Sequence, residues 1–315
     1  MTDIPENDIS AARFVEIDAE REGQRIDNFL MAQLRSLPKS MIYKIIRTGQ
    51  VRVNKGRIKP VYRLQVGDVV RIPPLRVGPE SEEISPSQGV LRQIEQSIIF
   101  EDDALIVLNK PAGIAVHGGS GLSYGVIEAM RKLRPELQAL ELVHRLDRET
   151  SGCLLLAKKR SALRLLHELM RNGEVGKHYL ALCQGVWRGG ARDIDAPLLK
   201  NTLSSGERMV RVTPNGKAAL SRFTPQQSFK EATLMEVELM TGRTHQIRVH
   251  AAFSGHPLAG DEKYGDKEFN QQMKGLGLKR LFLHAKRIYF PWNGGRLEFQ
   301  APLNDELEAV LKRLD

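Results

Sequence analysis

The sequence predicts an α+β protein, with a mixed, mostly antiparallel central sheet and flanking helices in its larger part and a small basic domain ahead of it. Three observations predict this class. Strand-like segments outnumber helix-like ones and often follow one another directly, which is typical of antiparallel sheets. A stretch rich in Pro, Glu and Ser divides the 315-residue chain into two unequal parts. The excess of Lys and Arg lies almost wholly in the first part.

The net charge of +9 is spread unevenly along the chain. Residues 1–23 carry two basic and seven acidic residues, so this segment is expected to form an acidic N-terminal extension. Residues 24–76 carry twelve basic residues against two acidic ones, whereas the remaining 239 residues carry 33 and 29. Solvated surfaces usually mix both signs, so a ratio of twelve to two favours binding to a polyanion. We call residues 24–76 the basic module.

The basic module is expected to fold into a compact domain. Apolar residues recur at helical spacing over 26–34 and 41–46, which predicts two helices. A short hairpin is predicted to turn at 54–56, and two further short strands are predicted to meet at 67–68. Two helices followed by a small basic sheet resemble the S-four-like RNA-binding domain. The resemblance implies that phosphates contact Lys39, Lys44, Arg47, Arg52, Lys55 and Arg57.

A linker is expected over 77–93, because its centre is rich in Pro, Glu and Ser. The larger domain is then expected over 94–315. An amphipathic helix is predicted over 161–172, with Ser161 as its cap, and another helix in the last dozen residues. Strands are predicted in SIIF, ALIVLNK, KHYLALCQG, TLMEVELM and LFLHAKRIYFP.

Common cofactor signatures are missing from the sequence. GGSGLSYG lacks the last glycine of a dinucleotide-binding loop, since Tyr124 stands there, and there is no phosphate-binding loop with Gly-Lys-Ser or Gly-Lys-Thr. His245 and His250 are five residues apart, not the four that place two metal ligands on one helical face. The zinc deaminase pattern is also missing. We therefore expect neither a metal nor a cofactor.

Other features suggest a cytoplasmic protein that does not contact membranes. The two cysteines, Cys153 and Cys183, lie in apolar stretches and are expected to be buried thiols. The N-terminus is acidic and unlike a secretory signal, and no apolar run approaches the roughly 18 residues of a membrane helix. Because no heptad or apolar repeat is visible, a monomer is expected.

Two segments concentrate residues that could carry chemistry. HRLDRETSG, residues 144–152, places Asp147 between two arginines, just before an apolar strand. By itself this pattern favours a structural Asp–Arg pair. TGRTHQIRVH, residues 241–250, is predicted to begin a helix that ends at Gly255. This helix is predicted to carry a cationic face made of Arg243, His245, Arg248 and His250. Tyr179, in a predicted strand, would on pattern alone be an ordinary sheet aromatic.

Together with NKPAG (109–113), KHYLAL (177–182) and HPLAGDEKYG (256–265), these segments resemble the RluA family of pseudouridine synthases in order and spacing. The resemblance extends from about residue 94 to about residue 300. It implies the pseudouridine synthase fold and isomerisation of uridine to pseudouridine in RNA. No group is imported and nothing is oxidised in this reaction, so neither a metal nor a cofactor is required.

The resemblance also implies roles for single residues. Asp147 matches the essential carboxylate, and Arg248 matches the basic residue that pairs with it. Tyr179 matches the tyrosine that packs on the target base and accepts the proton from carbon 5. Arg145 matches the arginine that fills the gap left by the flipped-out nucleotide. Three further residues are expected to bind the substrate: His144, Arg243 and His245.

Several alternatives stay open at this stage. The carboxylate could attack the sugar, add to the uracil ring or assist removal of a sugar proton. The chain could instead be a non-catalytic RNA-binding protein, or a glycosidic hydrolase that pairs Asp147 with Glu149 or Asp102. It could also act on transfer RNA. The basic module favours large-subunit (23S) ribosomal RNA, or its assembly precursors, as the partner.

Overall fold

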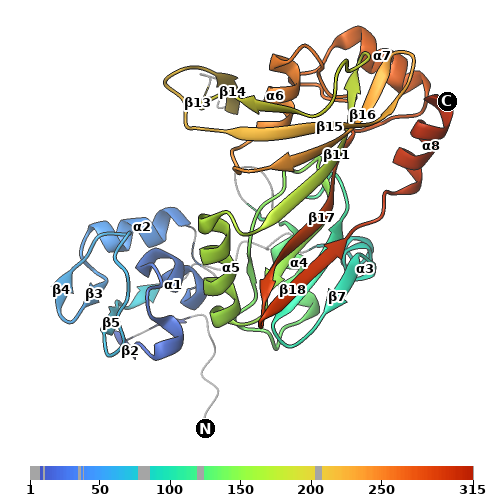
Figure 1. Cartoon of the computed structure of the whole chain (residues 1–315). Coiled ribbons are helices and arrows are strands. Elements are labelled where there is room, and N and C mark those ends of the chain that lie inside the picture. The colour runs from blue at the N-terminus through green and yellow to red at the C-terminus, as the bar shows by residue number, and fades with distance from the viewer. Residues whose placement is uncertain are drawn as a thin grey trace. The chain divides into compact units, whose positions relative to one another are not determined.

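The structure is a computed structural model that describes residues 8–9, 11–34, 37, 39–76, 86–118, 124–202 and 208–314 (Figure 1). It contains two compact units, which comprise residues 1–84 and 85–315. We call them the N-terminal and C-terminal units and describe each by itself. No helix in the described ranges combines the length and apolar character needed to cross a membrane.

The N-terminal unit packs two helices against a small antiparallel sheet. The helices confirm the two helices predicted from the apolar spacing. The sheet has the order β2-β5-β3-β4. Side chains from both helices and the sheet form one core, which includes Phe29, Ile42 and Val70. The bounds are β2 Arg13–Glu16, a 3₁₀ turn Ala19–Arg21, α1 Ile26–Gln33, α2 Lys39–Arg47, β3 Arg52–Val53, β4 Gly56–Arg57 and β5 Val69–Ile72.

The predicted hairpin is present, because β3 and β4 pair across a turn in which Asn54 and Lys55 both have positive φ. The strand pair predicted around 67–68 is wrong in part. Only β5 forms there, and its preceding loop is held by the Asp68 carboxylate. That carboxylate accepts hydrogen bonds from the Asn54 side chain at 2.7 Å and the Tyr62 hydroxyl at 3.0 Å. These hydrogen bonds to the buried carboxylate hold the loop in place of the backbone hydrogen bonds that a second strand would have made.

The N-terminal boundary of this unit differs from the expected acidic extension. β2 lies within residues 1–23 and pairs with β5 along its whole length, so that stretch is part of the unit's sheet. A second pair of short strands joins β1, Asp8–Ile9, to β6, Leu75–Arg76. The composition of the segment is acidic, but alternation in Arg13–Glu16 puts Val15 against the core.

The expected linker over 77–93 overlaps a helix. α3, Gln88–Gln96, begins after Ser87, whose side chain accepts a hydrogen bond from the Val90 backbone N–H. Leu91 and Ile94 of α3 are buried in the core of the C-terminal unit. The serine that suggested a linker is therefore the cap of this helix. Residues 77–85 of the expected linker lie outside the described residues.

The C-terminal unit is built on a ten-stranded sheet. Its main path is β12-β15-β16-β11-β17-β10-β8-β7, with β18 beside β17 and β9 beside β10. The pair β10–β17 is parallel, and the other pairs are antiparallel, which confirms the predicted sheet type. The bounds are β7 Ile98–Glu101, β8 Leu105–Lys110, β9 Glu141–Leu142, β10 Ser151–Ala157, β11 Gly176–Gln184, β12 Arg192–Asp195, β15 Leu220–Ser228, β16 Ala232–Leu239, β17 Leu283–Trp292 and β18 Gly295–Gln300. A separate hairpin pairs β13 Leu198–Thr202 with β14 Arg208–Val212.

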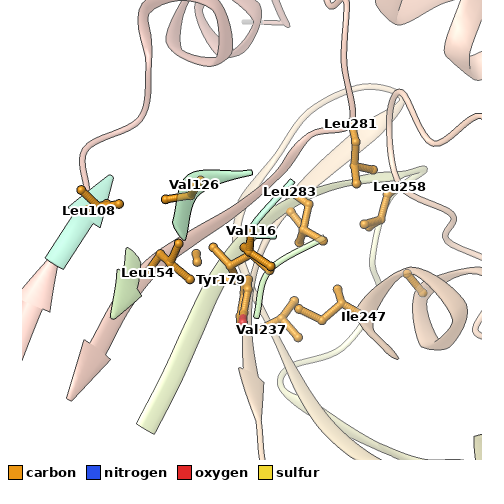
Figure 2. Close-up of a cluster of buried hydrophobic side chains, with 14 of the residues drawn as sticks. Leu108, Val116, Val126, Leu154, Tyr179, Val237, Ile247, Leu258, Leu281 and Leu283 are labelled. Atoms are coloured by element: carbon orange, nitrogen blue, oxygen red, sulfur yellow. The ribbon is translucent and has the colours of Figure 1, made fainter. Parts of the chain in front are cut away.

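Helices cover both faces of this sheet. Successive residues of a strand point to opposite faces, and apolar residues on each face pack against helices. Leu154, Ala181 and Met235 share one core with α3, α4 and α6 (Figure 2). Leu155 packs with α5, and Leu182 with α7 and α8, in two further cores. The bounds are α4 Val126–Leu133, α5 Arg160–Asn172, α6 Gln246–Phe253, α7 Lys267–Gly275 and α8 Asp305–Leu314.

Helix α5 lies where predicted, but its cap does not. It begins at Arg160, and its N-cap residue is Lys159, which makes no side-chain cap hydrogen bond. Ser161 lies inside the first turn. The C-terminal end agrees with the prediction, since Gly173 adopts the left-handed conformation that ends a helix.

Candidate active site

Asp147 lies in the loop that connects β9 to β10. Its side chain is 32% exposed, and neither neighbouring arginine pairs with it. Arg148 instead donates to the Gly113 carbonyl at 2.8 Å. The second residue of β10 is Gly152, with φ of +108°, where a Cβ would lie 2.2 Å from the Ala285 carbonyl oxygen. Only glycine permits this close approach of β10 to β17 directly after the Asp147 loop.

The start of α6 brings two nitrogen-bearing side chains, one of them the Arg248 guanidinium, toward Asp147. His245 Nε2 lies 3.8 Å and Arg248 Nη1 3.9 Å from Asp147 Oδ2. His245 is the N-cap residue and has a φ of +54°, in the left-handed region. The Gln246 side chain stabilises this turn by accepting a hydrogen bond from the Arg243 backbone N–H at 2.9 Å. Both distances exceed a direct hydrogen bond, so the carboxylate remains open to a ligand.

Arg248 has a closer partner than Asp147. Its Nε and Nη2 donate to the two oxygens of Asp261 at 2.7 and 2.6 Å. The Asp261 side chain is fully buried. Burial opposes the charge on both groups, but their mutual hydrogen bonds outweigh it, lowering the pKa of Asp261 and raising that of Arg248. The predicted Arg248–Asp147 pair is thus a long contact made by a guanidinium that Asp261 holds in place.

Tyr264 links His245 to the β13–β14 hairpin. Its hydroxyl accepts a hydrogen bond from the Val210 backbone N–H at 3.0 Å and lies 2.8 Å from His245 Nδ1. The Arg248 guanidinium carbon lies 5.0 Å from the centre of the Tyr264 ring. The sequence did not single out Asp261 or Tyr264, although both lie in HPLAGDEKYG, one of the segments that carried the family resemblance.

Tyr179 lies in β11 and is buried among apolar side chains that include Val116, Ile247 and Leu283 (Figure 2). Burial, and then the charge of Asp147, raise the pKa of the phenol well above its ordinary value of 10. The free protein therefore holds a neutral phenol. A neutral ring suits packing against a base better than accepting a proton.

A cavity of about 440 Å³ lies in front of these residues. It is large enough for a nucleotide and falls within the range of ordinary ligand sites. Of the described residues that line it, Asp147 alone carries a carboxylate. Six cationic side chains also line it: Arg145, Arg148, Lys177, Lys200, Arg243 and Arg248. This excess of positive charge suits a nucleic acid that places one of its bases in the cavity.

The other substrate-binding candidates lie at this cavity, but they differ in how freely they could act. Arg145 and Arg243 are exposed, and Arg243 Nε donates to the Ala218 carbonyl at 3.1 Å. The His144 ring is tied to the sheet, since its Nε2 accepts a hydrogen bond from the Leu155 backbone N–H at 3.2 Å. His250 does not join the predicted cationic face. It is fully buried, because α6 packs that side against the sheet.

Two basic side chains, the fully buried Lys110 and the half-buried Arg280, support the Asp147 loop, and the sequence did not identify either. Lys110 Nζ donates to the Arg148 carbonyl at 3.2 Å and to two other carbonyls. Arg280 Nη2 donates to the Glu149 carbonyl at 3.2 Å and to Ser151 Oγ at 2.9 Å. Burial, and then the charge of Arg280, lower the pKa of Lys110 to about 7. Sequence pattern cannot pair residues so far apart along the chain.

Two neutral histidines flank the same loop. His284 lies 2.9 Å from Ser151 Oγ through Nδ1 and 2.9 Å from the Ala301 carbonyl through Nε2. A neutral ring that donates from Nε2 and accepts at Nδ1 satisfies both partners. His144 likewise needs a free lone pair on Nε2 to accept from Leu155. Burial lowers the pKa of each imidazole from 6.5 to about 4.

We expect the protein to be sensitive to mild acid. In the unfolded chain His144 and His284 bind protons near pH 6.5, but in the folded protein only near 4. Their contribution is complete above 6.5, and the free energy of unfolding falls as pH decreases from 6.5 to 4. Each contributes at most about 3 kcal/mol to this loss. Urea unfolding between pH 7.5 and 4.5 measures this loss of stability. The His284→Gln variant is expected to show a weaker dependence of the free energy of unfolding on pH. The exposed His117→Gln variant is the control. A free energy of unfolding that is constant over this range would contradict the expectation.

Comparison with known proteins agrees with the geometry. The profile of the family described as RNA pseudouridylate synthase matches residues 104–253, and that of the S4 domain matches residues 24–70. Ribosomal large subunit pseudouridine synthase C of Haemophilus influenzae is 57% identical over 308 residues, which are 97% of this chain and 96% of that protein. The protein of the same name from Escherichia coli K12 is 54% identical, with 96% and 97% covered.

The fold also resembles a solved human structure. Human RNA pseudouridylate synthase domain containing 4 superposes with a TM-score of 0.60 at 28% identity, and the match covers 72% of this chain and 95% of that one. The matched family profile includes the strand that carries Tyr179 and the segments that carry Asp147 and Arg248. With this identity over nearly its whole length, the chain belongs to the RluA family of RNA pseudouridine synthases.

Proposed function

We propose that this enzyme isomerises specific uridines of 23S ribosomal RNA, or of its assembly precursors, to pseudouridine, with Asp147 as the catalytic carboxylate. One observation carries the residue assignment. Asp147 is the one carboxylate among the described residues that line a cavity rich in Arg and Lys, together with a buried tyrosine and a guanidinium held by an ion pair. The substrate assignment rests on the bacterial relatives, which are named for the large ribosomal subunit.

The reaction replaces the bond between ribose C1′ and uracil N1 by a bond between C1′ and C5. Carbon 5 loses a proton and N1 gains one, so atoms balance without a co-reactant. Asp147 meets the sugar or the ring of the flipped-out nucleotide. Arg248, held in place by Asp261, stabilises the negative charge of the Asp147 carboxylate. His245 lies beside the same carboxylate oxygen and contributes a further polar contact to the substrate.

Tyr179 packs on the target base. Stacking of a base on an aromatic ring is worth about 1–3 kcal/mol, which offsets part of the few kcal/mol needed to flip the nucleotide out. Its raised pKa keeps the phenol protonated, so little phenolate is present to accept a proton, which favours packing as its main contribution. Exposed Arg145, at the cavity, fills the place that the nucleotide leaves. Arg243 and His144 line the substrate path.

A hydrolase that cleaves the glycosidic bond is less well supported. Such enzymes need two carboxylates flanking the sugar. The Asp102 side chain instead accepts hydrogen bonds from the Ala104 and Leu105 backbone N–H groups at 2.7 Å each, within the β7–β8 turn. Glu149 pairs with Arg148 and does not line the cavity. Among the residues that the structure describes, Asp147 thus has no second carboxylate beside it in the cavity.

The basic module is proposed to bind ribosomal RNA through phosphates. Lys44, Arg47, Arg52, Lys55 and Arg57 are all exposed, and the side chain of Lys39 lies outside the described residues. The core of the N-terminal unit runs from Ile17 to Leu75, whereas the cores of the C-terminal unit begin at Leu91. Because these cores are separate, each unit has its own basis for stability. The enzyme is proposed to act in the cytoplasm as a monomer, without a cofactor.

Mapping pseudouridines in ribosomal and transfer RNA tests the proposal. A strain without the gene should lack specific 23S pseudouridines, and the full chain should restore them. A chain that lacks residues 1–76 should restore them poorly while staying folded, because the phosphate contacts are lost. Binding of 23S RNA by the full chain should weaken with salt, with a slope of about −0.7 to −0.9 per phosphate contact. Sites lost only from transfer RNA, or a flat salt response, would contradict the proposal.

A further inference from the structure

Four side chains form a row across the outer face of the sheet in the N-terminal unit. Phe14 of β2 lies opposite Arg71 of β5, Arg71 opposite Arg52 of β3, and Arg52 opposite Arg57 of β4. Residues that lie directly opposite each other in antiparallel strands share one face of the sheet. We call these four residues the arginine row; its strands are labelled in Figure 1.

The arginine row faces away from the core. The next row along the strands contains Val15, Val70 and Val53, and these side chains belong to or pack against the core with α1 and α2. Since successive residues alternate between faces, the arginine row points to solvent. Phe14 is 64% exposed, which is unusual for so large an apolar side chain.

The three guanidinium groups converge on the turn after α2. Arg71 Nη1 donates to the Gln50 carbonyl at 2.8 Å, and Arg52 Nε to the Gly49 carbonyl at 3.3 Å. Arg57 passes so close to Gly49 that a Cβ there would lie 2.8 Å from its Nε. In the described part of the chain, no carboxylate forms an ion pair with any of the three. Like charges placed directly opposite each other repel, so a bound anion would relieve a repulsion built into the sheet.

Phe14 has no ring partner of its own. None of the aromatic or cation–π contacts among the described residues involves it. An exposed aromatic ring at one end of three adjacent guanidiniums matches a nucleic acid in which one base is unpaired. The base stacks on the ring, and the flanking phosphates accept hydrogen bonds from the arginines. An acidic peptide would satisfy the charges but would leave the ring unused.

We propose that the arginine row is an RNA contact that binds an unpaired nucleotide, with its base on Phe14 and its backbone on Arg71, Arg52 and Arg57. This inference rests on the proposed function, since it presumes an RNA substrate. Phe14 and Arg71 lie outside the stretch that matches the S4 domain, residues 24–70. Strand β2 is therefore an addition to that domain that extends its binding surface by an aromatic residue.

Binding of two RNA probes to the full chain tests the role of Phe14. The probes are a labelled 12-nucleotide RNA without secondary structure and a perfect 12-base-pair RNA duplex. Phe14→Ala should weaken binding of the single strand by about 5- to 150-fold, because the stacking is lost, and should leave the duplex unaffected. Phe14→Trp should retain binding, and Phe14→Leu should not. Val61→Ala, at another exposed apolar position of the same unit, is the matched control.

Arg71 gives a second, independent readout. Arg71→Ala should reduce the slope of log affinity against log salt by about 0.7 to 0.9, whereas Arg71→Lys should keep it. Both positions lie outside the cavity, so their variants should raise KM without lowering kcat. The proposal for the arginine row would be overturned if Phe14→Ala bound the single strand as well as the parent does. It would also be overturned if the variant lost as much affinity for the duplex as for the single strand. Neither result would affect the proposed function, which fails only if pseudouridine formation does not depend on the gene or on Asp147.

Discussion

Replacing Asp147 with asparagine is expected to abolish uridine isomerisation while leaving the fold and RNA binding intact. Asparagine has the same shape but no charge, so it can neither act as a nucleophile nor stabilise a developing positive charge on the sugar. A loss of about 10²- to 10⁴-fold or more in kcat is expected. Release of tritium from 23S RNA labelled at carbon 5 of uridine measures the reaction directly, because isomerisation expels that hydrogen.

The structure provides a close control for this experiment. Glu149 lies two residues away and is exposed, and among the described residues its carboxylate pairs with Arg148 at 3.5 Å. Glu149→Gln should therefore retain nearly full activity. Asp147→Asn should also unfold at nearly the same denaturant concentration as the parent, since Asp147 is 32% exposed and its contacts with His245 and Arg248 are 3.8 and 3.9 Å long. Tritium release at the parental rate from Asp147→Asn would exclude this carboxylate as the catalytic group.

Replacing Arg248 with methionine is expected to reduce both stability and activity. The substitution leaves the Asp261 carboxylate buried without its bidentate partner. Removing one member of a buried ion pair typically costs about 3–5 kcal/mol. The free energy of unfolding should fall by this amount in urea denaturation at pH 7.5. The activity should fall as well, because Nη1 is the group of Arg248 that lies toward Asp147.

Variants at Asp261 separate the two effects. Arg248→Met with Asp261→Asn removes both charges, and an asparagine oxygen still accepts the Lys263 and Tyr264 backbone N–H groups. This double variant should regain much of the lost stability but little activity. Asp261→Asn alone should lower kcat more than it changes KM, because Asp261 positions Arg248 and does not line the cavity. A double variant with parental activity would show that Arg248 is only a structural residue.

Local sequence patterns predicted part of the secondary structure. Apolar spacing located the two helices of the basic module and α5, alternation located β11, and further strand-like segments located β8, β16 and β17. Two of the wrong predictions lie where the hydrogen bonds of one side chain determine the local structure. Asp68 holds a loop that was expected to be a strand, and Ser87 begins a helix where a linker was expected. In both places one polar side chain, rather than a periodic pattern, determines the local structure.

The chemistry-bearing residues were predicted as separate segments, and their assignment came from the family resemblance. Asp147, Tyr179 and Arg248 are brought to one cavity by three parts of the chain that are far apart in sequence. The sequence contained Asp261, Lys110 and Arg280 but gave no reason to select them. Their roles depend on partners 13 to about 130 residues away, reached only when the sheet is assembled.

By itself, then, the sequence determined many of the helices and strands, the concentration of positive charge in the basic module and the family. These properties depend on periodicity, composition and motifs, all of which are local. Tertiary structure alone decided that Arg248 is held by Asp261, that burial raises the pKa of the Tyr179 phenol, and that Phe14 joins three arginines in one row. Those properties depend on burial and on the pairing of distant strands, which exist only in the folded chain.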